Sequence, residues 1–293
     1  MERVGIIAGK GPIVAEVAKI LSQQGKEVVV ADLTSGTNQG IVEDELYFKV
    51  SPGQVGKIVK NLKRRGVSKV VFIGKVEKGE FLRGWLPKVD LTALKLLGRL
   101  KDWSDDSLMA AAIGFLEDSG IEVLGQREVL APLMAPEGVL GKKTPSDDQW
   151  RDIAYGFSMA KAIGALGIGQ TVVVKRRAVA AVESLEGTDA TIRRGGKLAG
   201  KGAVVVKVKR PHQVERMDLP GVGLETLRSA LEAGCSVLAF EAHETVLMER
   251  ERLVKEADAR GVAVVGVTPV MLEGYDLPRL SYSFPEETHG KSH

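Results

Sequence analysis

Short apolar runs alternate with helix-like repeats from the start of the chain. The run Arg3–Ala8 is followed by apolar residues at helical spacing, from Ile13 to Leu21, and then by a second run, Glu27–Ala31. Continuous runs of this length are typical of buried strands, whereas a 3.6-residue repeat indicates an amphipathic helix. Strands and helices that alternate across short connections predict a parallel sheet with helices on both faces.

The alternation continues through two regions that are separated by a segment without periodicity. This segment, residues 130–145, contains three prolines and two glycines, which favour a domain boundary. We therefore expect a Rossmann-like domain over residues 1–130, a linker at 131–145, a carboxyl-terminal α/β domain over 146–275 and a tail at 276–293. Further elements of the first domain are expected at Glu45–Val50, Val55–Arg65, Val67–Val76, from Ser104 to Leu116, and at Ile121–Leu124. Those of the second domain are expected from Ser146 to Leu166, and at Thr171–Lys175, Ala178–Val182, Ala203–Val208, Leu224–Ala233, Ser236–Phe240, Arg250–Arg260 and Val262–Val267.

The composition narrows the class of partner and the compartment. The 293 residues are 44% hydrophobic, and 41 basic residues against 38 acidic ones leave a net charge of only +3, which argues against nucleic acid as a partner. The single cysteine, Cys235, lies in an apolar run and is expected to pack as a small hydrophobic side chain. No apolar run approaches the ~20 residues of a membrane span, and the amino terminus lacks the layout of a signal peptide. We therefore expect a cytoplasmic protein.

A glycine loop between the first strand and the first helix is a candidate phosphate site. The loop is Gly9–Pro12, and the amides at a helix start favour an anion. Asp32 follows the second strand, where a dinucleotide-binding fold places its ribose-binding acid, but Val14 breaks the GxGxxG fingerprint. A generic nucleotide pocket is favoured over a nicotinamide site, and a purely structural turn remains open. Lys75 ends a later strand at its carboxyl end, where ligands of such sheets bind.

The densest charge pattern follows the apolar run Ala178–Val182. We expect this run to be a buried strand, with a turn at Gly187 and a short helix capped by Thr188 or Asp189. Acids at the end of a strand, followed by bases, suit a site that holds a divalent cation and an anionic substrate. A capped, solvated turn is the alternative. The charged residues of this stretch are Glu183, Glu186, Asp189, Arg193 and Arg194.

Two further polar stretches follow in the second domain. Asp218 lies between Met217 and Leu219, and an acid in apolar surroundings is costly unless it is paired or bound to a metal. A helix cap or a salt bridge to Arg216 is the alternative for this acid. The cluster Glu241–Thr245 follows an expected strand at its carboxyl end.

Several strings of the sequence match one known family. They are AGKG at 8–11, APEGVLG at 135–141, IGQTVVV at 168–174, AVESLEGTDATIRR at 181–194, KVKRPHQVERMDLPGVG at 207–223 and ADARGVAVVGV at 257–267. The EGTD and DLPxxG strings are the most specific. On these strings, almost the whole chain resembles the UDP-2,3-diacylglucosamine pyrophosphatase of lipid A biosynthesis, in the form unrelated to the metallophosphoesterase with the same activity.

The resemblance implies a magnesium-dependent hydrolase that converts UDP-2,3-diacylglucosamine to UMP and 2,3-diacylglucosamine 1-phosphate. Water is expected to attack the β-phosphorus, with the substrate held between the amino-terminal domain and a catalytic carboxyl-terminal domain. The resemblance also implies a homodimer. Because the substrate carries two acyl chains, we expect a weak, peripheral approach to the inner-membrane surface.

The resemblance also implies roles for individual residues. Asp218 is expected to bind Mg²⁺ or to orient the attacking water, Asp189 to be a second metal ligand, and Glu186 and Asp189 to be further catalytic candidates. Gly167 and His243 differ from the Asp and Gly usual in the family and are not expected in the site. Contacts with the substrate are expected from Gly9, Lys10, Gly11, Lys75, Asp105, Gln170, Thr188, Lys209, Gln213, Arg216, Glu241 and Thr245.

Two other functions remain compatible with the residues alone. A nucleotide-sugar-binding or regulatory protein would use the Gly9–Gly11 loop for phosphate without any chemistry. A nicotinamide-dependent oxidoreductase would use Asp32, and it is the weakest of the three hypotheses.

Overall fold

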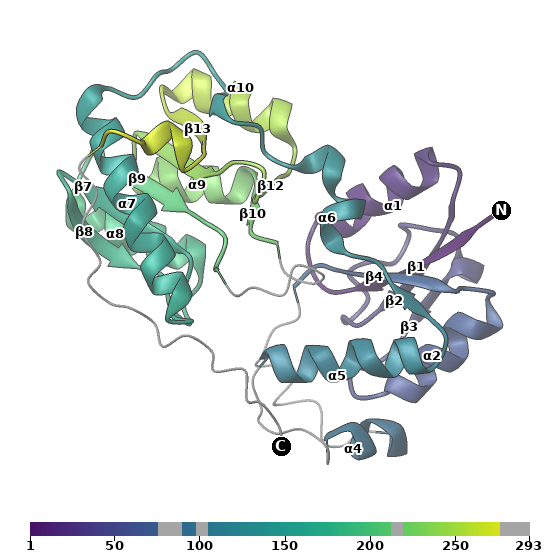
Figure 1. Ribbon diagram of the computed structural model, residues 1–293. Coiled ribbons are helices and arrows are strands. Elements are labelled where there is room, and N and C mark those ends of the chain that lie inside the picture. The colour runs from purple at the N-terminus through teal and green to yellow at the C-terminus, as the bar shows by residue number, and fades with distance from the viewer. Residues whose placement is uncertain (76–89, 98–104, 212–218, 276–293) are drawn as a thin grey trace. The chain divides into compact units, whose positions relative to one another are not determined.

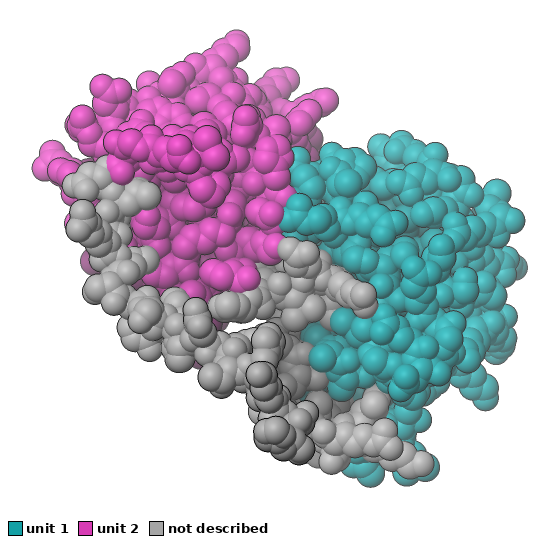
Figure 2. Space-filling model, in the orientation of Figure 1, with its two compact units in different colours: residues 1–134, 213–219 teal, residues 135–212, 220–293 magenta. Residues whose placement is uncertain are grey.

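The computed structural model describes residues 1–75, 90–97, 105–211 and 219–275, and it divides into two compact units (Figure 1). Unit 1 contains Met1–Met134 together with Leu219, and unit 2 contains the other described residues from Ala135 onward (Figure 2). Each unit has its own main sheet. The expectation of two α/β domains is therefore confirmed.

Unit 1 is built on a five-stranded sheet of order β3-β2-β1-β4-β5 in which every pair of neighbours is parallel. Its strands are β1 (Arg3–Ala8), β2 (Glu27–Asp32), β3 (Tyr47–Lys49), β4 (Lys69–Ile73) and β5 (Glu122–Val123). Its helices are α1 (Ile13–Gln23), α2 (Val55–Arg64), α4 (Leu91–Leu97), α5 (Asp105–Asp118) and α6 (Gln126–Val129), with 3-10 turns at Asp44–Leu46 and Ala131–Leu133.

Helices cover both faces of this sheet, as the alternating pattern predicts. Helices α2 and α5 share one apolar core with Ile7, Val29 and Val70 of the strands. Helix α1, which contacts α6, packs against the other face (Figure 1). Strands β1, β2 and β4 are largely buried and therefore appear in the sequence as continuous apolar runs.

Unit 2 is built on a six-stranded mixed sheet of order β6-β13-β11-β9-β7-β8 and a small sheet of two strands, β10 and β12. Its strands are β6 (Gly138–Val139), β7 (Thr171–Lys175), β8 (Ala178–Val182), β9 (Val204–Lys207), β10 (Gly221–Val222), β11 (Val237–Glu241), β12 (Val246–Leu247) and β13 (Ala263–Val267). Its helices are α7 (Asp147–Ala165), α8 (Thr188–Ala199), α9 (Leu224–Glu232) and α10 (Arg250–Arg260), with a 3-10 turn at Val270–Leu272. Strand β6 lies in the segment expected to link the domains and pairs antiparallel with β13.

Helix α7 packs on one face of the larger sheet, and α8, α9 and α10 contribute to the core on the other face. Helix α7 begins as expected, because Ser146 and Gln149 form a reciprocal capping box. Gly156 allows the helix to approach closely, since a Cβ at this position would lie 2.7 Å from Val206. Cys235 is buried in the core as expected, and burial raises the pKa of its thiol to about 11.

Strand β8 forms where the sequence predicts it, but the prediction that it is buried is wrong. Ala178 and Val179 are exposed, because β8 is the edge strand of the sheet and pairs only with β7 in the described chain. Apolar composition alone does not distinguish an edge strand from a central one.

The β7–β8 hairpin turns through Arg176 and Arg177, between the end of β7 and the start of β8. Both residues adopt the left-handed conformation, with φ of 52° and 58°, which is a type I′ geometry usually occupied by Asn and Gly. The buried Asp152 carboxylate accepts both backbone N–H groups, at 2.9 and 2.6 Å. Asp152 of α7 therefore stabilises a left-handed turn that two arginines disfavour.

Candidate active site

Polar side chains from several strands gather at one edge of the unit 2 sheet, which we call the carboxyl edge. The parallel strands β9, β11 and β13 end there. Strand β7 runs antiparallel to β9, so its first residue, Thr171, lies opposite Lys207, the last residue of β9. The end of β8 returns to the same edge, since Val182 pairs with Val172. Residues just before β7 and just after β8, β9 and β11 are therefore close together.

A first hydrogen-bonded network at this edge begins at Lys207, which is only 6% exposed. Its ammonium donates to the Thr188 hydroxyl at 3.2 Å and to the Gly221 carbonyl at 2.8 Å. Thr188 in turn donates to the buried Glu183 carboxylate at 2.7 Å, and Glu183 accepts the backbone N–H of Gln170 at 3.3 Å. A buried cation and a buried acid are thus joined through one hydroxyl group.

A second network connects α7 with the ends of β9 and β11. The Lys161 ammonium lies 2.6 Å from the Glu241 carboxylate and donates to the Lys209 carbonyl at 3.0 Å. Glu241 also accepts the Lys209 backbone N–H at 2.8 Å, and the Lys209 ammonium lies 3.0 Å from Glu244. Lys209 and Glu241 are both buried. Buried charges are costly, and here they occur together with matched partners.

Three expected site residues each present a buried oxygen that has no hydrogen-bond partner within the described chain. These atoms are Gln170 Oε1, Asp189 Oδ1 and Thr245 Oγ1. An unsatisfied buried acceptor costs about 1–3 kcal/mol, so such atoms usually have a partner that the protein alone does not supply. Two of them flank the first network, because Gln170 binds Glu183 and Asp189 follows Thr188.

The prediction that Thr188 or Asp189 caps the helix in this region is wrong. Helix α8 begins at Thr188, and its cap is Gly187, with φ of 81° and no side-chain bond. Glu186 lies in the preceding turn, where it accepts bonds from Ser184 N, Thr191 Oγ1 and Arg194 Nη2. The bond from Arg194 lowers the pKa of Glu186, which stays ionised. The observed contacts of Glu186 close the turn.

The residues expected to bind metal are only partly described. Asp189 offers the unpartnered oxygen noted above, a donor of the kind Mg²⁺ prefers. Within the described residues, no three His, Cys, Asp or Glu side chains gather closely enough to hold a metal ion. Mg²⁺ is commonly held by one or two carboxylates together with substrate phosphates, so Asp189 fits one position of such a site.

The glycine loop of unit 1 is fastened to β4. Lys10 and Lys75 exchange two backbone hydrogen bonds, of 2.8 and 2.9 Å, and the Gly9 N–H donates to Ile73. A Cβ on Gly9 would lie 2.7 Å from the Lys75 carbonyl, so this glycine is required by close packing. The amides of Gly9 and Lys10 are therefore used within the protein. The exposed Gly11, with φ of 122°, precedes α1.

Asp32 is fully buried and its carboxylate is saturated. Its oxygens accept bonds from Thr34 N and Oγ1, Asn38 Nδ2 and Tyr47 OH, all at 2.7–2.9 Å. Burial raises the pKa of Asp32, but these hydrogen bonds outweigh burial and lower the pKa overall. Asn38 also donates to the Gly9 carbonyl at 3.0 Å. The acid therefore organises the loop beside Gly9 through donors that all belong to unit 1.

The remaining expected site residues lie wholly or partly outside the described structure. Asp218, Gln213 and Arg216 are outside the described residues, and Asp105 opens α5 but its side chain is not described. Leu219, which follows Asp218, donates its backbone N–H to Gln126 Oε1 at 3.1 Å within unit 1.

From the sequence, Glu183, Lys207 and Glu244 were noted only within charged stretches, without individual roles, and Lys161 was not singled out. Lys161 left a detectable signal, because it lies four residues after Phe157 on the apolar face of α7. A single cation at a core-facing helical position requires a buried partner.

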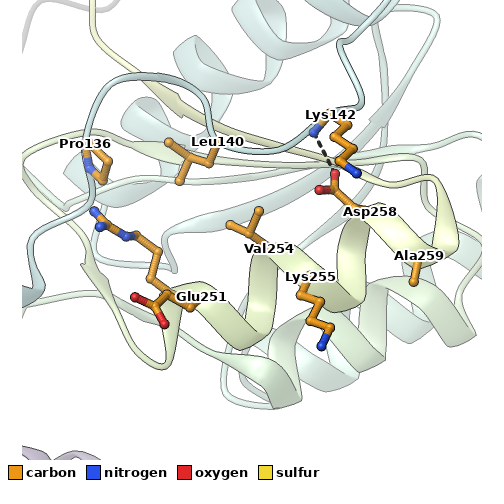
Figure 3. A pocket seen from close by; sticks show the side chains of 9 residues that line it. Pro136, Leu140, Lys142, Glu251, Val254, Lys255, Asp258 and Ala259 are labelled. Atoms are coloured by element: carbon orange, nitrogen blue, oxygen red, sulfur yellow. Dashed lines mark hydrogen bonds between the residues drawn. The ribbon is translucent and has the colours of Figure 1, made fainter.

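A hollow of about 730 Å³ lies elsewhere in unit 2, between the segment around Leu140 and helix α10 (Figure 3). Asp258 accepts the Lys142 backbone N–H at 2.7 Å and ties this segment to the helix. None of the expected site residues lines the hollow, and its Lys142, Arg250 and Lys255 are exposed. Buried charges identify the carboxyl edge as the better candidate for chemistry.

None of the helices in the described part of the chain has both the length and the apolar character needed to cross a membrane.

Comparison with known proteins identifies relatives of both units. The sequence-family model of the LpxI N-terminal domain matches residues 3–133, and the sequence-family model of the LpxI C-terminal domain matches residues 136–265. The chain is 33% identical over 282 residues to the UDP-2,3-diacylglucosamine pyrophosphatase LpxI of Caulobacter vibrioides, covering 92% of this chain and 99% of the relative.

Likeness to solved structures is weak. A GalE-like L-threonine dehydrogenase from Cupriavidus necator aligns with a TM-score of 0.30 and 9% identity over 92% of this chain and 97% of its own. A glycinamide-RNase-transformylase T from Mycobacterium tuberculosis aligns with a TM-score of 0.22 and 14% identity over 73% of this chain and 46% of its own. These values carry no argument about function.

Proposed function

The chain belongs to the LpxI family, and on that premise we propose that it hydrolyses UDP-2,3-diacylglucosamine to UMP and 2,3-diacylglucosamine 1-phosphate in lipid A biosynthesis. The relative from Caulobacter vibrioides carries the name of this activity and aligns over nearly its whole length. The proposed enzyme is thus a hydrolase of a phosphorus anhydride.

The observation that carries the proposal is the set of buried charges at the carboxyl edge. A pyrophosphate ester is an anion, and its hydrolysis concentrates further negative charge on phosphoryl oxygens. Lys207 and Lys209 hold ammonium groups at this edge in surroundings largely shielded from water, where electrostatic interactions are strong. Side chains fixed in this way stabilise developing charge without reorganising during the reaction.

In the proposed reaction, water attacks the β-phosphorus, the bond from that phosphorus to the bridging oxygen breaks, and UMP leaves with the bridging oxygen. The proton of the water passes to a carboxylate, for which Asp189 is the candidate among the described residues. Lys207 and Lys209 neutralise phosphoryl oxygens, Thr188, Gln170 and Thr245 orient the sugar phosphate, and Glu241 holds the Lys209 backbone. Mg²⁺, when bound, would withdraw charge from the phosphates and favour ionisation of the water.

Several finer features belong to the same proposal. We propose Asp189 and Asp218 as Mg²⁺ ligands, and Gly11, Lys10 and Lys75 of unit 1 as contacts of the substrate. We also propose a homodimer, by analogy with the family, and a weak, peripheral association with the inner-membrane surface, because the substrate is acylated.

The decisive experiment measures UMP release from UDP-2,3-diacylglucosamine with Mg²⁺ and with a chelator. Asp218→Ala and Asp189→Ala are expected to lower kcat by about 100-fold or more, because each removes a proposed ligand of the cation. Asp148→Ala is the matched control, since Asp148 is an exposed acid of α7 whose side chain is 90% exposed. It should retain wild-type turnover.

Each outcome has one meaning. Release that requires both Mg²⁺ and the two acids supports the proposed reaction and the proposed ligands. Release that persists in the chelator removes the metal from the proposal. Tight binding of the substrate by the folded wild-type protein without any product would overturn the reaction in favour of a nucleotide-sugar-binding protein.

A further inference from the structure

Lys161 of α7 contacts the carboxyl edge through the backbone of Lys209 as well as through the charge of Glu241. Lys161 donates to the Lys209 carbonyl at 3.0 Å, and its partner Glu241 accepts the Lys209 N–H at 2.8 Å. The Lys161 and Glu241 side chains are themselves 2.6 Å apart. The backbone of residue 209 is thus held on both its donor and its acceptor side.

The contacts of Lys161 and Glu241 with residue 209 lie just beyond the end of β9. The parallel ladder between β9 and β11 ends with the pair Lys207–Phe240, so sheet hydrogen bonds with β11 no longer hold residue 209. Val208 is still held, because its N–H donates to Gln170 O at 3.0 Å. From Lys209 onward, side chains replace the ladder. Lys161 and Glu241 therefore fix the backbone from which the Lys209 side chain extends, and the Lys209 ammonium lies 3.0 Å from Glu244.

We propose that Lys161 is a positioning residue for the reaction, acting through Glu241 and the Lys209 backbone to hold the Lys209 ammonium against a phosphoryl oxygen. The inference rests on the proposed function, because it assumes that Lys209 contacts the substrate. Lys161 itself does not contact the reacting atoms. Its ammonium lies over the Phe157 ring, 5.6 Å from the ring centre.

The opposite edge of the same sheet provides a matched comparison. Lys175, at the end of β7, donates to the carbonyls of Ala199 and Lys201, at 3.0 and 2.7 Å. It therefore satisfies one backbone acceptor at the end of α8 and one just beyond it, as Lys161 satisfies the Lys209 carbonyl, but far along the strand from the carboxyl edge. A lysine that only stabilises the fold should behave like Lys175.

The experiment compares Lys161→Met with Lys175→Met in steady-state UMP release and in thermal unfolding of the full chain. Both variants keep the aliphatic stem and lose the ammonium, so both are expected to lower the melting temperature. Only Lys161→Met is expected to lower kcat/KM, by about 10- to 100-fold, because loss of a supporting contact misplaces the group that acts. Lys161→Arg, which restores a cation beside Glu241, should recover most of this loss.

Several results would overturn the inference. One is a folded Lys161→Met variant with wild-type kcat and KM, and another is an equal loss in Lys175→Met. If Lys161→Met does not fold, Glu241→Gln replaces it, because Lys161 then keeps the Lys209 carbonyl and one amide oxygen as acceptors. This variant should fold and lose about 10-fold in kcat/KM, and wild-type values would refute the positioning role. An inactive wild-type protein would instead refute the proposed function.

Discussion

The two units present different kinds of polar chemistry at the carboxyl edges of their sheets. In unit 1, the buried Asp32 accepts four hydrogen bonds, three from Thr34 and Asn38 of the following loop and one from Tyr47 of β3. In unit 2, Lys207 and Lys209 are buried among acids, while Asp189 and Thr245 keep buried oxygens without a partner in the described chain. A saturated acid builds a rigid loop, whereas an unsaturated edge is prepared for something that binds to it. The comparison therefore indicates a structural role for the polar residues at the unit 1 edge and a chemical role for those at the unit 2 edge.

The largest effect that separates the two edges is expected from a lysine pair. Lys207→Met should lower kcat by about 100-fold, because it removes a buried charge placed for phosphoryl oxygens. Lys49→Met is the unit 1 counterpart, since the Lys49 ammonium also donates to a backbone carbonyl, that of Ser35, at 3.0 Å. It should stay within about threefold of wild type, as expected for a surface contact. Steady-state UMP release measures both, and equal losses would break the comparison.

A second prediction concerns stability in place of turnover. Asp32→Asn should lower the free energy of unfolding by about 2–4 kcal/mol, because an amide oxygen cannot accept the four bonds that the carboxylate accepts. Its kcat should change little. Denaturant titration measures the first quantity, and a variant as stable as wild type would show that the loop does not depend on the acid.

The pH dependence of the same pair of proteins sharpens this test. The pKa of Asp32 is lowered in the native state, so its contribution is present above the unfolded-state pKa and is lost as the pH falls through the native value. The stability difference between wild type and Asp32→Asn should therefore be constant from about pH 5 to 8 and shrink below about pH 4. A difference that persists unchanged at lower pH would assign the effect to packing and not to the charge.

The smallest effect is expected at the opposite edge of the unit 2 sheet, where no chemistry is proposed. Arg177→Gly should raise the free energy of unfolding by about 1 kcal/mol, because the residue is left-handed and Gly adopts that conformation without steric cost. Arg177→Ala is the control, since it removes the same side chain but keeps the strained backbone. A gain in both variants would trace the effect to the arginine side chain, and any change in kcat would extend the active region beyond the carboxyl edge.

The sequence predicted the elements that depend on local signals. Strand β1, strand β7 and helix α10 begin and end at the expected residues, because an apolar run or a helical repeat defines each of them. The burial of β8 could not be predicted, since the position of a strand in a sheet depends on partners remote in sequence.

The site shows the same limit. Gln170, Lys209 and Glu241 follow from strand ends and from the family strings, and the structure places them at one edge. The contacts of Lys161 join it to residues 48 and 80 positions away, and no local pattern specifies such pairs. The roles of Asp218 and of the metal stay predictions, because Asp218 lies outside the described residues.

The reversed direction of β7 has a consequence for how two motifs of the chain reach the carboxyl edge. In a wholly parallel sheet each strand sends only its end to the active edge, but the β7–β8 hairpin also brings the segment before Thr171 there, beside the one after Val182. The turn of the hairpin, at Arg176, lies at the other edge. The segments before Thr171 and after Val182 carry the IGQ and EGTD strings that the chain shares with its family. One hairpin therefore carries two shared motifs to the edge as a single unit, and a shift in its pairing with β9 would displace both motifs together.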